Sequence, residues 1–217
     1  MAAGLSYSAH LDTAQRARVE ALLANTRNGF NRVGSRAVNH VRPGVGKEMV
    51  EAVRQNVPLK VSVVRKALRF TRATVALPKA TTWLKGYPVP LSFFPHTPRT
   101  NFPYTRRGRA SRPARGVSAM LDINKGARVI DGTFIVKRSN TWRFSGGAAF
   151  EVVERVHETR LPIRIVHGPA PGEILARDKG RIEGIVKRAR DRLRERINHE
   201  LRFAFRQDGL LGFNPRG

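Results

Sequence analysis

The first part of the chain has a helical pattern of apolar and polar positions. Between residues 12 and 42, apolar side chains recur mostly at three- and four-residue steps, with arginines and asparagines between them. This spacing predicts an amphipathic helix, and Asp12 or Thr13 is a candidate cap for its start. The stretch "RPGVG" at residues 42–46 predicts its end, because proline cannot continue a helix and glycine loosens the chain.

Two shorter helices are predicted after this break. The first covers "KEMVEAVRQN", and the second begins at Val57-Pro58 and continues through "PLKVSVVRKAL". Proline suits the first turn of a helix, whereas the valines of the second segment also suit a strand. We therefore expect residues 12–70 to be helical.

After residue 71 the pattern becomes that of strands. "RATVALPKATTWLK" and "YPVPLSFF" read as strands or extended segments, with prolines typical of sheet edges. "VSAMLDI", "ARVIDGTFIVKR" and "AAFEVVERV" predict three strands, joined by the turn-like connectors "NKG" and "SNTWRFSGG". "LPIRIV" is a fourth strand or an extended segment. A β-rich region over residues 71–166 follows, interrupted by a long Pro/Arg/Gly loop at residues 95–116.

The last predicted element is a long amphipathic helix over residues 173–206. Its apolar positions track one helical face, and charged residues occupy the others. Residues 1–11 and 208–217 are predicted to be flexible tails. Helices, then strands, then a helix favour an α+β fold with a mainly antiparallel sheet, built as a single domain over residues 12–207.

Composition adds a strong positive charge to this picture. The 217 residues, 41% of them apolar, include 41 Lys and Arg against 16 Asp and Glu, a net charge of +25. Such a charge calls for a polyanionic neighbour, either nucleic acid or an acidic protein. No acidic residue lies between Glu51 and Asp122, and the loop within this stretch carries six arginines with Phe102 and Tyr104 among them. The predicted contacts to DNA or to an acidic partner are Arg99, Arg106, Arg107, Arg109, Arg112 and Arg115.

The sequence offers no constellation for catalysis. It has no cysteine, which excludes disulfides, thiolate catalysis and cysteine-based zinc sites. "RPGVGKE" lacks the first glycine and the Ser/Thr of a phosphate-binding loop, and the six histidines are scattered. No apolar run is long enough for a membrane span, and we expect no signal peptide. We predict no catalytic, metal-binding or cofactor-binding residue and no membrane partner.

The second half carries a family resemblance. "GVSAMLDINKGARVIDGTFIV", "FEVVERV", "RLPIRIVHGPAPGEIL" and a long charged helix follow one another in this order. Their order and spacing resemble the bacteriophage minor tail protein Z family, the tail completion proteins of long-tailed phages, over roughly residues 24–206. Ala170 stands where that family usually has a serine. The residues that carry the resemblance are Phe134, Leu161, Pro162, Ile163, Gly168 and Pro169.

The resemblance implies a structural, non-enzymatic virion protein of the tail or neck, assembled in the host cytoplasm. It further implies a ring of identical subunits, hexameric to match the tail tube, that completes the head-proximal end of the tail. Its partners would be the tail terminator, tail tube and neck or connector proteins, with non-specific phosphate contacts to phage DNA. The alternative, from charge alone, is a non-enzymatic nucleic-acid-binding protein of ribosomal or nucleoid type, although no known motif of that kind is present.

Overall fold

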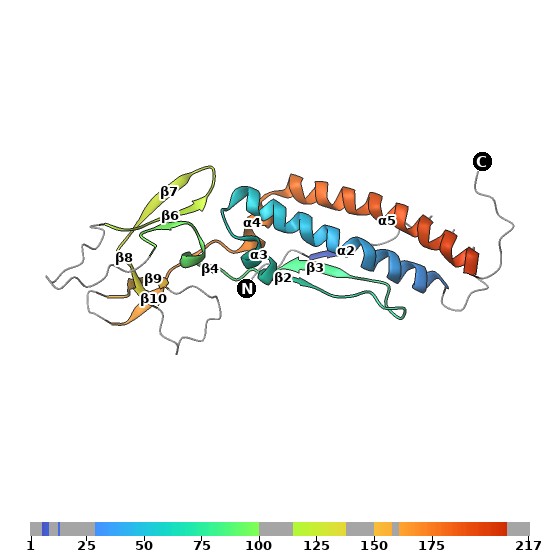
Figure 1. The fold of residues 1–217 in the computed structure, drawn as a ribbon, viewed down its shortest axis with the longest axis horizontal. Coiled ribbons are helices and arrows are strands. Elements are labelled where there is room, and N and C mark those ends of the chain that lie inside the picture. The colour runs from blue at the N-terminus through green and yellow to red at the C-terminus, as the bar shows by residue number, and fades with distance from the viewer. Residues whose placement is uncertain are drawn as a thin grey trace. The chain divides into compact units, whose positions relative to one another are not determined.

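The computed structural model confirms an α+β fold with antiparallel strand pairing (Figure 1). It describes residues 6–8, 13, 29–99, 115–137, 150–157 and 161–207, without the side chains of 6–8 and 204–207. The chain forms two compact units. Unit 1 comprises Met1–Ala3, Glu51–Ala67 and Lys85–Ile174, and unit 2 comprises Gly4–Val50, Leu68–Leu84 and Leu175–Gly217. That residues 12–207 form a single domain stays a prediction.

Helix α2 (Gly29–Asn56) continues through the segment that was expected to end it. Pro43 lies inside this helix, so the predicted break at residues 42–46 and the separate helix over "KEMVEAVRQN" are wrong. A proline in a helix interior costs about 3 kcal/mol. Burial of Val41, Val45 and Met49 offsets that cost, because each of these side chains is almost completely removed from solvent. The predicted cap Asp12 and residues 14–28 lie outside the described residues, and Thr13 is helical.

The glycines after Pro43 serve packing. A Cβ at Gly44 would lie 2.5 Å from Nη1 of Arg192, and one at Gly46 would lie 3.0 Å from Cδ2 of Leu68. These glycines therefore let two neighbouring segments approach the backbone of α2 closely.

Unit 2 is built around the two opposite faces of α2. One face meets α5 (Lys179–Gln207), which runs antiparallel to it, because Glu48 pairs with Arg188 whereas Arg36 pairs with Glu200. The other face meets the ribbon of β2 (Leu68–Phe70) and β3 (Thr81–Leu84), as Figure 1 shows. Burial on both faces explains why this helix tolerates a proline.

The strands that pair with β3 change two of the predicted boundaries. Strand β1 (Ser6–Ser8) pairs with β3, so these residues are not part of a flexible tail as predicted. Strand β2 occupies Leu68–Phe70, the last three residues of the region predicted to be helical. Both segments are too short to show a period, and their pairing with β3 decides their conformation.

The C-terminal helix is divided in two. The predicted helix over residues 173–206 consists of α4 (Pro171–Arg177) and α5, with Asp178 between them. Oδ1 of Asp178 accepts a hydrogen bond from the backbone N–H of Arg181 at 3.1 Å, the geometry of a helix N-cap. The predicted apolar face is confirmed for α5, whose buried apolar side chains are Ile185, Ala189, Leu193 and Ile197.

Unit 1 contains most of the strands and the helix predicted to begin at Val57-Pro58, which begins only at Val61. Helix α3 covers Val61–Ala67, and the 3-10 helix η1 covers Leu91–Phe93. The sheets are β5 (His96–Thr97), β6 (Gly116–Asp122) and β7 (Gly126–Asp131); β8 (Thr133–Lys137), β9 (Phe150–Arg155) and β10 (Ile163–Ile165); and β4 (Val89–Pro90) with β11 (His167–Gly168). No helix in the described part of the chain is long and apolar enough to cross a membrane.

One predicted strand and one predicted loop need correction in unit 1. "ARVIDGTFIVKR" is not one strand, because Gly132, with φ of +71°, separates β7 from β8, and the two belong to different sheets. The predicted loop at residues 95–116 is shorter, because its first part contributes β5 and Gly116 begins β6. The connector "SNTWRFSGG" lies outside the described residues.

Thr133 joins the two larger sheets of unit 1. Its hydroxyl donates to the carbonyl of Ile130 at 2.6 Å and accepts from the backbone N–H of Val117 at 2.9 Å. Gly116 is needed beside it, because φ is +141° there and a Cβ would collide with the carbonyl oxygen of Ile130. Around this junction the core contains Leu91, Phe94, Val117, Val152 and Val153.

Candidate polyanion-binding and assembly surfaces

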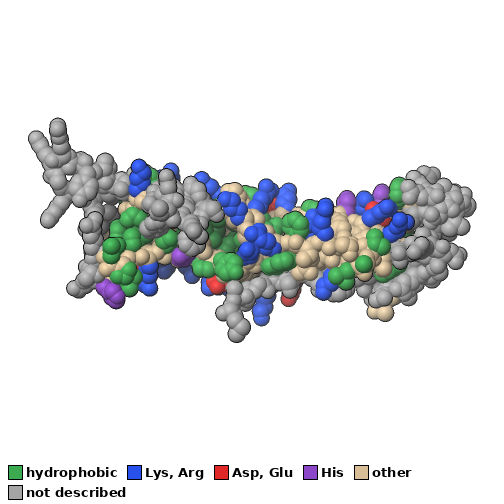
Figure 2. Space-filling model, turned by 90° about the horizontal axis from the view of Figure 1, so that it is seen from below, with side chains coloured by type: hydrophobic (Ala, Val, Ile, Leu, Met, Phe, Trp, Pro, Cys, Tyr) green, Lys and Arg blue, Asp and Glu red, His purple; other side chains and the backbone are tan. Residues whose placement is uncertain are grey.

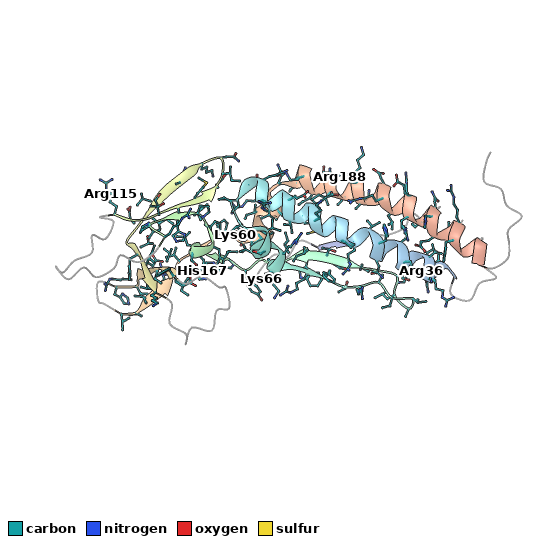
Figure 3. All side chains as sticks on the ribbon, viewed as in Figure 1. Arg36, Lys60, Lys66, Arg115, His167 and Arg188 are labelled. Carbon is teal, nitrogen blue, oxygen red and sulfur yellow. The ribbon has the colours of Figure 1, made fainter. Side chains whose placement is uncertain are left out.

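The basic loop, which is the arginine-rich part of the loop predicted at residues 95–116, connects two paired strands of one sheet. Arg99 follows β5 and Arg115 precedes β6, and these strands pair with Thr97 opposite Ser118. Both arginines are exposed, and Figure 3 shows Arg115 projecting from the start of β6. Neither has a side-chain partner among the described residues. Arg106, Arg107, Arg109 and Arg112 lie outside the described residues, so their contact to DNA or to an acidic partner stays a prediction.

The glycine of the "HGPAPG" motif is a packing residue. Gly168 pairs with Val89 in the β11–β4 sheet. A Cβ at this position would lie 2.6 Å from Cε2 of Phe94 and 3.0 Å from Cδ2 of Leu121. Only glycine leaves room for these two side chains, and the chain then passes through Pro169 into α4.

The other motif residues also lie on structural elements. Phe134 on β8 faces Arg155 of β9, whose Cζ lies 5.3 Å from the ring centroid. Ile163 begins β10 opposite the same Arg155, and Pro162 accepts a hydrogen bond from Val156 at 3.1 Å. Leu161 is 67% exposed, so it is the motif residue best placed to meet another molecule.

Two carboxylates of unit 2 fix α2 against α5. Glu48 accepts hydrogen bonds from Nε of Arg188 at 2.9 Å and from Nη2 of Arg192 at 2.5 Å. Glu200, only 5% exposed, is bound by Arg196 at 2.5 Å and lies 3.9 Å from Arg36. These acids neutralise part of the basic surface of α5, and the sequence gives no signal for the cross-helix pairs because the partners lie far apart along the chain.

A third acid is buried in unit 1. Glu151 is 2% exposed and accepts a hydrogen bond from the hydroxyl of Ser92 at 2.7 Å. Within the described ranges, no three His, Cys, Asp or Glu side chains form a group that could hold a metal ion. The hydrogen bond joins η1 to β9, which points to a structural role for this carboxylate.

Arg42 is a partly buried cation of unit 2 that stacks on an aromatic ring. Its guanidinium carbon lies 3.8 Å from the ring centroid of Phe70 on β2. Its Nε and Nη1 are buried and form no hydrogen bond with a described residue. Burial lowers the pKa of Arg42, and the positive charge of Arg72 lowers it further. Sequence reasoning missed this pair, because neither residue shows a local pattern that indicates the other.

The surface is rich in cations and also exposes apolar side chains. On the face shown in Figure 2, Lys and Arg side chains recur over the described surface, whereas Asp and Glu side chains are few. Among the described strands β7 pairs only with β6, and its Val129 is 52% exposed. An edge strand with an exposed apolar side chain is suited to pairing with another molecule. Further exposed apolar side chains are Leu77, Tyr87, Ile123 and Leu161.

These features define a basic α+β protein in which the buried carboxylates of the described residues form internal contacts. The chain belongs to the prophage minor tail protein Z (GPZ) family, whose model matches residues 15–207. Comparison with curated proteins and with solved structures finds no match. Membership makes the chain a structural protein of the phage tail, a virion component whose neighbours are other tail proteins. This role points to a non-enzymatic protein.

Proposed function

We propose that this chain completes the head-proximal end of the phage tail and supports the joining of head and tail. The family match over residues 15–207 carries this proposal, because it includes the greater part of both compact units. In this role the subunits form a hexameric ring around the DNA channel, in contact with the tail terminator, the tail tube and the neck or connector proteins.

The exposed apolar side chains support a role in assembly. Strand β7 offers backbone groups along its outer edge, and Val129 adds an apolar contact beside them. A neighbouring subunit that adds a strand to β7 would gain main-chain hydrogen bonds and bury this valine.

The net charge supports a place beside DNA. Copies that each carry a charge of +25 repel one another, so a ring of them needs a polyanion or acidic neighbours. DNA phosphates in the channel supply that counter-charge without base recognition. Contacts between phosphates and solvated arginines exchange readily, which suits DNA that has to move through the ring.

Imaging of phage particles tests the proposal. Without this chain, we expect tails that fail to join filled heads, and a tagged copy should restore joining and appear at the head-proximal end of the tail. A tag found elsewhere on the particle, or normal joining without the chain, would contradict the proposal. A monomer recovered on RNA and absent from tails would favour the nucleic-acid-binding alternative.

A further inference from the structure

We propose that Arg42, Phe70 and Arg72 form a phosphate-binding patch in unit 2, and that its ligand is the backbone of DNA. The patch adds a specific DNA contact to the proposed function. It rests on that function only in taking the DNA to be that of the phage. It is separate in sequence from the basic loop.

The first element of the patch is the stack of Arg42 on Phe70. The distance of 3.8 Å from the guanidinium carbon to the ring centroid is short for a cation–π contact, and Phe70 remains 53% exposed. The stack holds the guanidinium against the ring, and its Nε and Nη1 are buried without a hydrogen-bond acceptor among the described residues. A phosphate beside the stack would give these donors acceptors once the side chain turns outward.

The second element is Arg72, whose backbone is fixed next to this stack. On one side of it, the backbone N–H of Thr71 bonds to the carbonyl of Thr81 at 2.8 Å. On the other side, Asn39 of α2 binds both the carbonyl and the N–H of Ala73, at 2.8 and 3.1 Å. Arg72 lies two residues beyond Phe70, the last residue of β2, and its positive charge acts on Arg42. The lowered pKa of Arg42 reflects burial first and the charge of Arg72 second.

The patch has no acidic partner among the residues that the structure describes. No acidic residue occurs from residue 52 to residue 121, and Glu48, the acid of α2 nearest in sequence to Arg42, is engaged by Arg188 and Arg192. Arg188 is therefore a neutralised arginine of the same unit, whereas Arg42 and Arg72 form no ion pair with a described residue. Two guanidinium groups with no counter-ion among the described residues attract an anion strongly.

The chemistry of the patch favours DNA over an acidic protein. The planar guanidinium fork matches the oxygens of a phosphate diester. The exposed part of the Phe70 ring suits contact with a sugar or a base, which a carboxylate side chain does not offer. A single-sign basic surface around the patch would hold DNA without reading its sequence.

Binding of the full chain to a labelled 20-base-pair duplex, followed by fluorescence anisotropy over a salt series, tests the patch. For Arg42→Gln with Arg72→Gln we expect binding about tenfold weaker near 0.1 M salt, and a salt slope reduced by about 0.9 for each phosphate that the variant no longer neutralises. The matched control, Arg190→Gln with Arg194→Gln, removes the same charge from exposed positions of α5 and should change binding less than about threefold.

Further variants separate binding from folding. Arg72 is exposed, so Arg72→Gln alone should unfold as the parent chain does and still weaken binding severalfold. Equal weakening in the patch variant and in the α5 control would overturn the proposal, because DNA would then respond to net charge alone. An equal reduction of binding to a polyglutamate peptide would also overturn it, in favour of an acidic protein ligand. The proposed function is tested separately by the location of the chain in the phage particle. The anisotropy measurement does not depend on that location, so the two proposals can fail independently.

Discussion

Gly168 lies against Phe94 so closely that a Cβ at this position would come 2.6 Å from Cε2 of the ring. Phe94 is 3% exposed and belongs to the core of unit 1. Gly168→Ala should therefore lower the free energy of unfolding by about 1–3 kcal/mol, the usual cost of overpacking. Thermal and urea unfolding followed by circular dichroism measure this change.

The matched control is Gly180→Ala in the first turn of α5, where a Cβ meets nothing within 4 Å. There the alanine should leave stability unchanged or raise it by up to about 1 kcal/mol, because alanine favours helix. If both substitutions had the same effect, the contact with Phe94 would not explain the glycine of the motif.

Asp178 separates α4 from α5 by capping the longer helix. Asp178→Ala removes the acceptor for the N–H of Arg181 and should cost about 1 kcal/mol of stability. Asp178→Asn keeps a capping oxygen and should recover most of that stability. Asp191→Ala, an exposed position within α5, controls for the removal of one negative charge. A destabilisation at Asp191 as large as that at Asp178 would argue against the cap.

Much of the fold could be predicted because its signals are local. The strands of unit 1 and the apolar face of α5 follow from periods of two and of about four residues along the sequence. The continuation of α2 through Pro43 could not be predicted, because it depends on burial against segments that are distant in the sequence. In the sequence, Gly44 and Gly46 indicate a loosened chain after Pro43, whereas in the fold their neighbours Arg192 and Leu68 give them a packing role.

The candidate surfaces were predictable only in part. The acid-free stretch indicates a basic surface, and the exposure of Arg99 and Arg115 agrees with it. The stack of Arg42 on Phe70 was not foreseeable, because a helix residue and a strand residue meet only in the folded chain. The contact of Glu48 with α5 could not be predicted for the same reason.

Glu48 should contribute measurably to the packing of α2 on α5. Its side chain is 18% exposed and binds two arginines, so Glu48→Gln should lower the free energy of unfolding by about 1–2 kcal/mol. This destabilisation should shrink as salt is added, because salt screens the charges in the parent chain. Urea unfolding at low and high salt tests this, with Glu195→Gln on the exposed side of α5 as the control. An equal effect of both changes would show that only net charge matters.

Val129 should contribute to self-association through the edge of β7. Val129→Asp places a charge at a side chain that is 52% exposed, so the fold of the subunit should persist. If a neighbouring subunit buries this valine, removing about 1.5–3 kcal/mol of burial energy weakens association roughly tenfold or more. Analytical ultracentrifugation over a concentration series measures this. Val75→Asp, at an exposed valine of unit 2, is the control, and equal weakening by both would argue against the β7 edge.

Three of the six loop arginines give the last prediction, which concerns DNA and the joining of heads to tails. Replacement of Arg106, Arg107 and Arg109 by Ser should leave the fold intact and weaken DNA retention or head joining, since each removed charge leaves a phosphate without its partner. The salt slope of DNA binding should fall by about 0.9 for each such phosphate. Serine at Arg190, Arg194 and Arg202, all exposed on α5, removes the same charge elsewhere. Joined particles that hold DNA normally with the loop variant would show that the loop faces another protein or solvent.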